Sequence, residues 1–228
     1  MVEFTYTDYQ AILLSARVAS VATLAALPFG FLAAYLLVFS GIRGKAVLDG
    51  LINLPLVLPP VVVGYLLLVM LGEGGWLGSL LREWGIRIVF TWKAAVVASA
   101  VVGFPLLVRS VRIGMEEIDP RLVQASRTLG AHWHDTVFTV ILPLSRRSLL
   151  AGATLMFARS LGEFGATIIL AGNIPGLTQT IPLAIYDYTN TPGGDPKALA
   201  LCLVSIVISF AVLLVNEGVV RRFRGGHT

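Results

Sequence analysis

Charged residues are scarce in this chain. They make up 13% of its 228 positions, about half the share of roughly 25% that soluble globular domains carry. Cysteine is nearly absent as well, and because Cys202 stands alone an intrachain disulfide cannot form. The chain is instead rich in hydrophobic residues, which account for 56% of it, and its mean hydropathy is +0.83. This composition indicates that lipid, rather than water, is the main solvent of the protein.

The sequence also lacks a nucleotide-binding signature. No stretch fits G-x-x-x-x-G-K-[ST], the pattern whose backbone amides and lysine hold the phosphates of ATP. No nucleophile and base stand paired on the loops, and His132 and His134 have no further histidine or cysteine near them in the sequence. We therefore expect that this chain is not an enzyme and binds no cofactor or metal. Its net charge of +4 suits loops held on one side of a membrane and does not indicate nucleic-acid binding.

Long uncharged stretches recur along the chain, and a helix needs about 20 apolar residues to cross a bilayer. We expect an all-α integral membrane protein, with five transmembrane helices in one domain that covers residues 1–228. The expected spans are approximately 12–39, 50–71, 90–111, 149–171 and 198–218. The third uncharged stretch is short, and Trp92 and Lys93 extend it at the membrane interface.

Lysine and arginine gather on one side of the expected membrane. If the N-terminus is outside, most of the 17 fall in the inside loops and after the last span. Such a bias sets the orientation of membrane proteins, so we expect the N-terminus outside and the C-terminus in the cytoplasm. The first ten residues lack the basic start of a signal peptide, and we expect the first helix to remain in the mature chain.

Three prolines interrupt the second expected span. Pro55, Pro59 and Pro60 are followed by Gly64. Each proline removes a backbone donor and clashes with the preceding turn, so this helix must bend or break. Carbonyl groups left without partners inside a membrane need other donors, so the bend should face protein or a water-filled path. A kink that serves only packing and a pore-lining role both fit the sequence.

A polar loop, expected in the cytoplasm at 112–147, separates the third and fourth spans. Asp119 and Pro120 predict an N-cap followed by proline at the first helical position, and Gly130 predicts the end of that helix. A second short helix is expected at about 131–142, ended by Pro143. The two helices form a helix-turn-helix with one apolar face, which suits docking in a groove on a partner protein.

This loop resembles the motif of bacterial ABC-importer permeases, written E-A-A, three residues, G, nine residues, I-x-L-P. The corresponding positions are Gln124, Ala125, Ser126, Gly130, Val140, Leu142 and Pro143. The chain departs from the motif by Gln124 for the glutamate, Ser126 for the second alanine and Val140 for the isoleucine. In that family the loop is the coupling element that inserts into the ATPase subunit, so the resemblance implies that these residues couple the chain to an ATPase.

Further stretches resemble the molybdate permeases of that family. They are Leu54–Gly64, Arg127–Ala131, Ala158–Thr167, Asn173–Gly176 with Thr180–Pro182, and Thr191–Gly194. The resemblance implies the type I permease fold in the bacterial cytoplasmic membrane. It also implies a homodimer of permeases, two ATPase subunits that bind ATP and Mg²⁺, and a periplasmic or lipid-anchored molybdate-binding protein. The transported ion is then molybdate, with tungstate and sulfate left open as alternatives.

A self-sufficient secondary transporter is an alternative from another class. Such carriers usually show internal repeats and several intramembrane carboxylates. The sequence shows no internal repeat, and Glu163 is the one carboxylate expected in the interior of a span. The spacing of the loop motif therefore favours the ATP-driven importer.

Arg159 and Glu163 are opposite charges in the fourth expected span. They lie four positions apart and so share a helix face. A helix that begins near Arg147 would place Arg159 about 18 Å into the membrane, where an unpaired charge costs about 2.5–3.5 kcal/mol. Both side chains should therefore face the interior of the bundle. Either they line the translocation path, or they form a structural ion pair that fixes helix packing.

Overall fold

The structure, a computed structural model, describes residues 4–224, and within that range its regular elements are all helices. The expectation of an all-α fold is confirmed. In chain order the elements are α1 (Tyr6–Phe39), α2 (Lys45–Val57), α3 (Pro60–Leu71), α4 (Trp76–Glu83), α5 (Trp92–Glu116), α6 (Pro120–Thr128), α7 (Trp133–Thr136), a π-helical segment (Val137–Ile141), α8 (Leu142–Leu161), α9 (Gly165–Leu170), α10 (Ile181–Thr189) and α11 (Asp195–Arg224).

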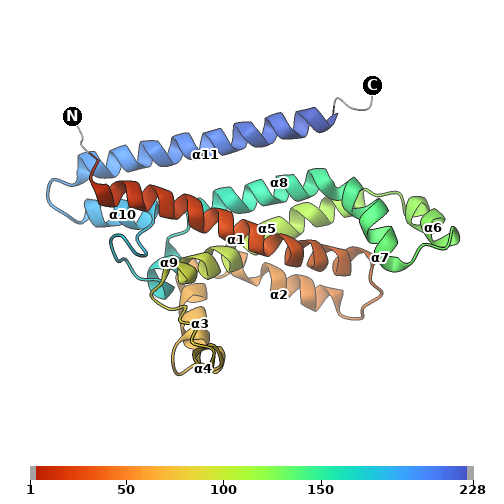
Figure 1. The fold of residues 1–228 in the computed structure, drawn as a ribbon, viewed down its shortest axis with the longest axis horizontal. Coiled ribbons are helices and arrows are strands. Elements are labelled where there is room, and N and C mark those ends of the chain that lie inside the picture. Colours follow the sequence, from red (N-terminus) through yellow and green to blue (C-terminus); the bar gives the residue numbers. More distant parts are fainter. Residues whose placement is uncertain (1–3, 225–228) are drawn as a thin grey trace.

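Helices α1, α5 and α8 pack together as the centre of an elongated bundle, and α11 runs along its outside (Figure 1). Small residues bring α1 close to α5: a Cβ atom added at Gly30 would lie 2.6 Å from a methyl group of Leu107. Ala22, Ala26 and Ala34 of α1 are buried in the same cluster as Leu107. Membrane helices associate through such close packing, because lipid supplies little hydrophobic drive between them.

Length and composition identify the membrane-crossing helices. Four continuous helices qualify among the described residues, namely Tyr6–Phe39, Trp92–Glu116, Trp133–Leu161 and Asp195–Val215. The pair α2–α3 qualifies together, as a span broken by a bend of 113°. Pro55 lies inside α2, Pro59 precedes α3 and Pro60 is its first residue. The protein is therefore a multi-pass membrane protein, and residues 4–224 hold four spans, or five if the bent pair counts as one.

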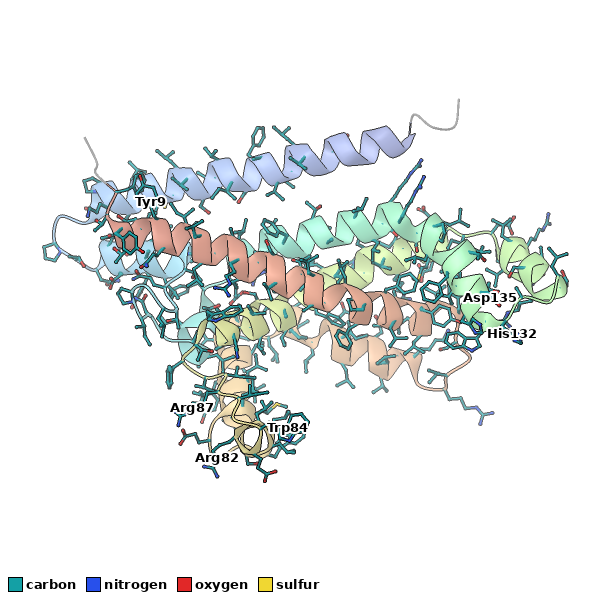
Figure 2. The ribbon with its side chains drawn as sticks, viewed as in Figure 1. Tyr9, Arg82, Trp84, Arg87, His132 and Asp135 are labelled. Atoms are coloured by element: carbon teal, nitrogen blue, oxygen red, sulfur yellow. The ribbon has the colours of Figure 1, made fainter. Side chains whose placement is uncertain are left out.

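Helices α3 and α4 project on the side of α2 (Figure 1), and α3 packs against α5 and α9 of the bundle. Trp76 and Leu80 of α4 and Trp84, which follows it, recur at intervals of four and are all exposed. Arg82 and Arg87 lie in the same corner of the molecule (Figure 2). Exposed tryptophan beside arginine is typical of a segment at a membrane–water interface.

Two sequence expectations about helix ends are wrong. The helix that begins at Trp133 does not stop at Pro143: it continues through the π-helical segment into α8. The ring of a proline clashes with the carbonyl group four residues earlier. Here the turn before Pro143 is widened, and Leu142 N–H donates to the Val137 carbonyl five residues back.

The expected fourth span, 149–171, is also not one helix. α8 ends at Leu161, and α9 begins only at Gly165. Glu163 lies in this interruption rather than on a helix face, so the expected i, i+4 helical geometry with Arg159 is replaced by a contact across the end of α8. Gly162 and Gly165 flank the break, and glycine costs about 1 kcal/mol relative to alanine inside a helix.

Candidate functional site

The α6–α7 segment, residues 119–136, projects from one end of the bundle (Figure 1). Asp119 caps α6, because its Oδ1 accepts a hydrogen bond from the Arg121 N–H at 2.9 Å. Gly130 closes the helix with a φ of +86°, a conformation that favours glycine. Two backbone bonds complete a Schellman motif: Gly130 N–H donates to the Arg127 carbonyl and Ala131 N–H to that of Ser126. The turn between α6 and α7 is therefore sharply defined.

Ser126 joins the two helices of this segment. Its Oγ lies 2.6 Å from Oγ1 of Thr136, whose side chain is buried. The motif residues expected to couple to an ATPase are distributed around this bond. Gln124 and Ala125 are exposed on α6, and Val140 is half-buried in the π-helical segment. Leu142 and Pro143 form the first turn of α8, so the structure brings the motif together at the junction of three helical pieces.

Large apolar side chains are exposed on this end of the molecule. Leu129 is 87% exposed, Trp133 66% and Phe138 67%. Exposed apolar groups beside polar ones mark surfaces that bind another protein. His132 and Asp135 lie on the same tip (Figure 2), where the His132 N–H donates to Asp135 Oδ2 at 3.1 Å. The described residues contain no group of three or more side chains arranged to hold a metal ion.

Arg159 and Glu163 form an ion pair in the interior of the bundle. The Arg159 NH1 atom lies 2.7 Å from Glu163 Oε2. Glu163 Oε1 accepts a hydrogen bond from the Ala166 N–H, at the start of α9, at 2.8 Å. The Glu163 side chain is 1% exposed and that of Arg159 31%. One carboxylate thus links the last turn of α8 to the first turn of α9 and bridges the interruption between them.

The two interrupted helical segments meet at their interruptions. A Cβ atom added at Gly64 of α3 would lie 2.8 Å from the Ala166 Cα atom, which belongs to α9. A Cβ atom added at Gly165 would lie 2.9 Å from the Pro60 Cβ atom. Both glycines therefore permit a close approach that alanine would disturb. Irregular backbone at membrane depth persists where it is buried in protein or lines a water-filled path, and here part of it is buried against the other break.

Sequence reasoning missed this junction between α3 and α9. The local signals were present, since Gly64 follows the prolines and Gly165 follows the charged pair. Nothing in the sequence, however, indicates that these two positions meet.

The sequence also contained no indication of a hydrogen-bond network between α1 and α10, at the end of the molecule opposite the α6–α7 segment (Figure 1). The Tyr188 hydroxyl of α10 donates to Oδ1 of the buried Asp8 of α1 at 2.7 Å. Burial, and then the hydrogen bond and charge of Asp8, raise the pKa of Tyr188 to about 12. Ser15 of α1 accepts from the Ile181 N–H at 2.8 Å. These bonds attach α10 to the first turns of α1.

The chain is similar to components of bacterial transport systems. A family model described as "Binding-protein-dependent transport system inner membrane component" matches residues 26–225. The chain is 51% identical over 218 residues to the molybdenum transport system permease protein ModB of Escherichia coli (strain K12), with 95% of each chain covered. It is 35% identical over 223 residues to the sulfate transport system permease protein CysT of the same organism, covering 95% of this chain and 78% of the relative.

Solved structures share the fold. A bacterial ABC transporter for alginate, in complex with an alginate-bound periplasmic protein, matches with a TM-score of 0.75 and 16% identity, covering 96% of this chain and 80% of that one. The MetNI methionine ABC transporter in an inward-facing conformation matches with a TM-score of 0.69 and 17% identity, covering 94% and 93%. The permease fold implied by the loop motif is confirmed.

Proposed function

This chain belongs to the family of binding-protein-dependent transport system inner membrane components, and from that membership we propose that it is the permease subunit of an ATP-driven molybdate importer. One observation carries the choice of anion. Relatives named for molybdenum transport match the chain along nearly its whole length at higher identity than those named for sulfate transport. Tungstate, an anion of nearly the same size and charge, is a second candidate for the same path.

The proposed assembly contains two copies of this chain, two ABC ATPase subunits that bind ATP and Mg²⁺, and an extracytoplasmic binding protein. The exposed Leu129, Trp133 and Phe138 support an ATPase contact on the α6–α7 segment. Four or five spans enclose little room for a hydrated ion, and this supports a second copy of the chain that forms the path together with the first. The membrane orientation in this assembly has the N-terminus outside and the α6–α7 segment in the cytoplasm.

The proposed mechanism is alternating access, transmitted by a continuous series of contacts. Closure of the ATPases on ATP would displace the α6–α7 segment, which Ser126 and Thr136 hold together. The helix that starts at Trp133 carries this displacement through α8. The Arg159–Glu163 pair then passes it to α9, which packs against the broken span at α3. In this scheme the ion pair is a positioning element that moves the two breaks together.

Reconstitution tests the proposed function. The chain is co-expressed with its cognate ATPase and reconstituted in proteoliposomes with the cognate binding protein. We expect ATP-dependent uptake of molybdate, and ATPase activity that rises when the binding protein is loaded with molybdate. A complex that responds to sulfate but not to molybdate would overturn the choice of anion. Uptake that proceeds without the ATPase would instead support a secondary transporter.

Labelling tests the proposed orientation. In a Cys202→Ser background, single cysteines at Thr191 and Arg127 are exposed to a thiol reagent that does not cross membranes, in intact cells. We expect the reagent to label Thr191→Cys and not Arg127→Cys. The reverse pattern would overturn the orientation.

A further inference from the structure

A pocket of about 340 Å³ opens between α2 and α5, away from the Arg159–Glu163 pair. Its polar and charged lining residues are Asp49 and Asn53 of α2 and Arg109 and Arg112 of α5, and Pro105 also lines it. Neither the loop motif nor the junction of the broken helices contributes a residue to this pocket. The proposed function has so far given it no role.

The spacing of these residues shows how the pocket is built. Pro105, Arg109 and Arg112 are four and three positions apart, so they share one face of α5. Asp49 and Asn53 are four positions apart and share the facing side of α2. At 1.5 Å per residue, Arg109 lies about 6 Å and Arg112 about 10 Å beyond Pro105 along α5. The pocket therefore runs from the middle of α5 toward the end next to α6, which the proposed orientation places in the cytoplasm.

Most charges in the pocket already have partners. Oδ1 of Asp49 accepts a hydrogen bond from Asn53 Nδ2 at 3.0 Å and lies 3.2 Å from the Arg112 NH1 atom. Arg112 Nε also donates to Glu116 Oε1 at 2.8 Å. The Asp49 carboxylate is thus occupied by two donors, and Arg112 is shared between two carboxylates.

Arg109 is different. Among residues 4–224, no ion pair or hydrogen bond of its side chain is found, although it lines the same pocket. A guanidinium group has five N–H donors in a planar fork, and this geometry matches two oxygens of a tetrahedral oxyanion. Lipid phosphate offers the same chemistry, because long arginine side chains reach the headgroups. A lipid-facing surface would not, however, present Asp49 and Asn53 opposite the guanidinium, since such polar residues face protein or a water-filled cavity.

We propose that this pocket is a transit site for the transported tetrahedral oxyanion, with Arg109 as its principal ligand. The site suits passage rather than storage, because conduction requires binding weak enough to allow departure. Asp49 contributes to that weakness by holding Arg112 and by placing a carboxylate beside the anion. This inference rests on the proposed function and specifies where the anion contacts the membrane subunit.

The test compares three variants in the reconstituted complex, with molybdate as the probe for uptake. Arg109→Gln removes the charge, Arg109→Lys keeps the charge but loses the fork, and Arg43→Gln removes an exposed cation from the loop before α2 as a matched control. We expect Arg109→Gln to lower the molybdate imported per ATP hydrolysed about tenfold, which corresponds to about 1.4 kcal/mol. The molybdate imported per ATP by Arg109→Lys should lie between the values for Arg109→Gln and the wild type. The value for Arg43→Gln should equal that of the wild type.

A direct measurement distinguishes the two candidate ligands of Arg109, the transported oxyanion and the phosphate of a lipid headgroup. Crystals of the complex soaked in tungstate should show anomalous scattering from tungsten beside Arg109, and the Arg109→Gln complex should lack it. Unchanged import per ATP in Arg109→Gln, with no tungsten in the wild-type pocket, would overturn the transit site in favour of a lipid contact. The proposed function would survive that outcome as long as the wild type imports molybdate. A wild-type complex inert to molybdate would overturn the proposed function, and this inference with it.

Discussion

Pro60 and Gly165 are neighbours in the fold, although one starts α3 and the other starts α9. A Cβ atom on Gly165 would stand 2.9 Å from that of Pro60, closer than side chains approach without displacement. Each residue follows an interruption in a helical segment. The two irregular regions therefore support each other, and substitutions on either side of the contact should disturb both.

Gly64→Ala should destabilise the protein. The new methyl group would meet the backbone of Ala166 at 2.8 Å, and backbone atoms cannot move aside as a flexible side chain can. Inserting a methyl group into such a contact costs about 1–3 kcal/mol. Thermal unfolding of the purified complex measures the effect. Gly50→Ala is the control, since nothing lies within 4 Å of its Cβ position. Equal melting temperatures for the two variants would contradict the close contact.

Glu163→Gln should destabilise the protein while leaving one hydrogen bond in place. The amide oxygen can still accept from the Ala166 N–H, but Arg159 loses its counter-charge. Removing one partner of a buried pair costs about 3–5 kcal/mol, and we expect about 3 kcal/mol or less because Arg159 is 31% exposed.

A double-mutant cycle with Arg159→Gln isolates the interaction between the two side chains. If the losses in the free energy of unfolding of the two single variants add up to that of the double variant, the charges do not interact. The same variants separate structure from function: Arg159→Gln with intact molybdate uptake would show that the pair is not needed for transport.

Gly130→Ala should weaken the communication between ATPase and membrane helices. The position has a φ of +86°, and nothing lies within 4 Å of the added methyl group, so the change introduces backbone strain alone. This strain is about 1–2 kcal/mol. Gly193→Ala is the matched control, with a φ of +78° and the same open surroundings in the loop before α11.

Both variants should lose similar stability, but only Gly130→Ala should lower the ATPase stimulation by the loaded binding protein. Equal stimulation of the ATPase in Gly130→Ala and Gly193→Ala would show that this turn has no coupling role.

Tyr188→Phe should cost stability at neutral pH and progressively less at high pH. The folded protein holds the pKa of Tyr188 at about 12, above the ordinary value of 10.0. The raised pKa means that the protonated hydroxyl stabilises the fold fully below pH 10, and that this contribution is lost as pH rises toward 12. The stability difference between wild type and variant should therefore be constant below pH 10 and shrink above it. A difference that stays constant up to pH 12 would show that the hydroxyl is not held by Asp8.

Local chemistry made the α6–α7 segment predictable. Asp119 caps and Gly130 terminates α6 because both roles depend on the residue's own backbone geometry and short-range bonds. Pro143 shows where such rules stop. The sequence predicts that a proline ends the helix before it, yet the helix accommodates the ring by widening the preceding turn. The difference between ending and widening is decided by packing along α8, which the local sequence does not encode.

Contacts between residues that are distant along the chain could not be predicted from the sequence. The prolines of the second span indicate a break, but not that Gly64 meets Ala166. Similarly, the pocket itself is not visible along the chain, because Asp49 and Arg109 come from helices separated by the whole of α3 and α4. A break in the fourth span was equally unpredictable, because apolar residues continue on both sides of Glu163.

The unbroken helix from Trp133 to Leu161 has a mechanical consequence. Its first turns run at an angle to α8, so the element has an elbow near the π-helical segment (Figure 1). A bent helix with a stiff bend acts as a lever, because a displacement of its short arm moves its long arm in another direction. At 1.5 Å per residue the 29 residues measure about 43 Å along the rod. A rotation about the bend would thus move Arg159 about twice as far as Trp133, because the arm from Leu142 to Arg159 is about twice as long as the arm from Trp133 to Ile141.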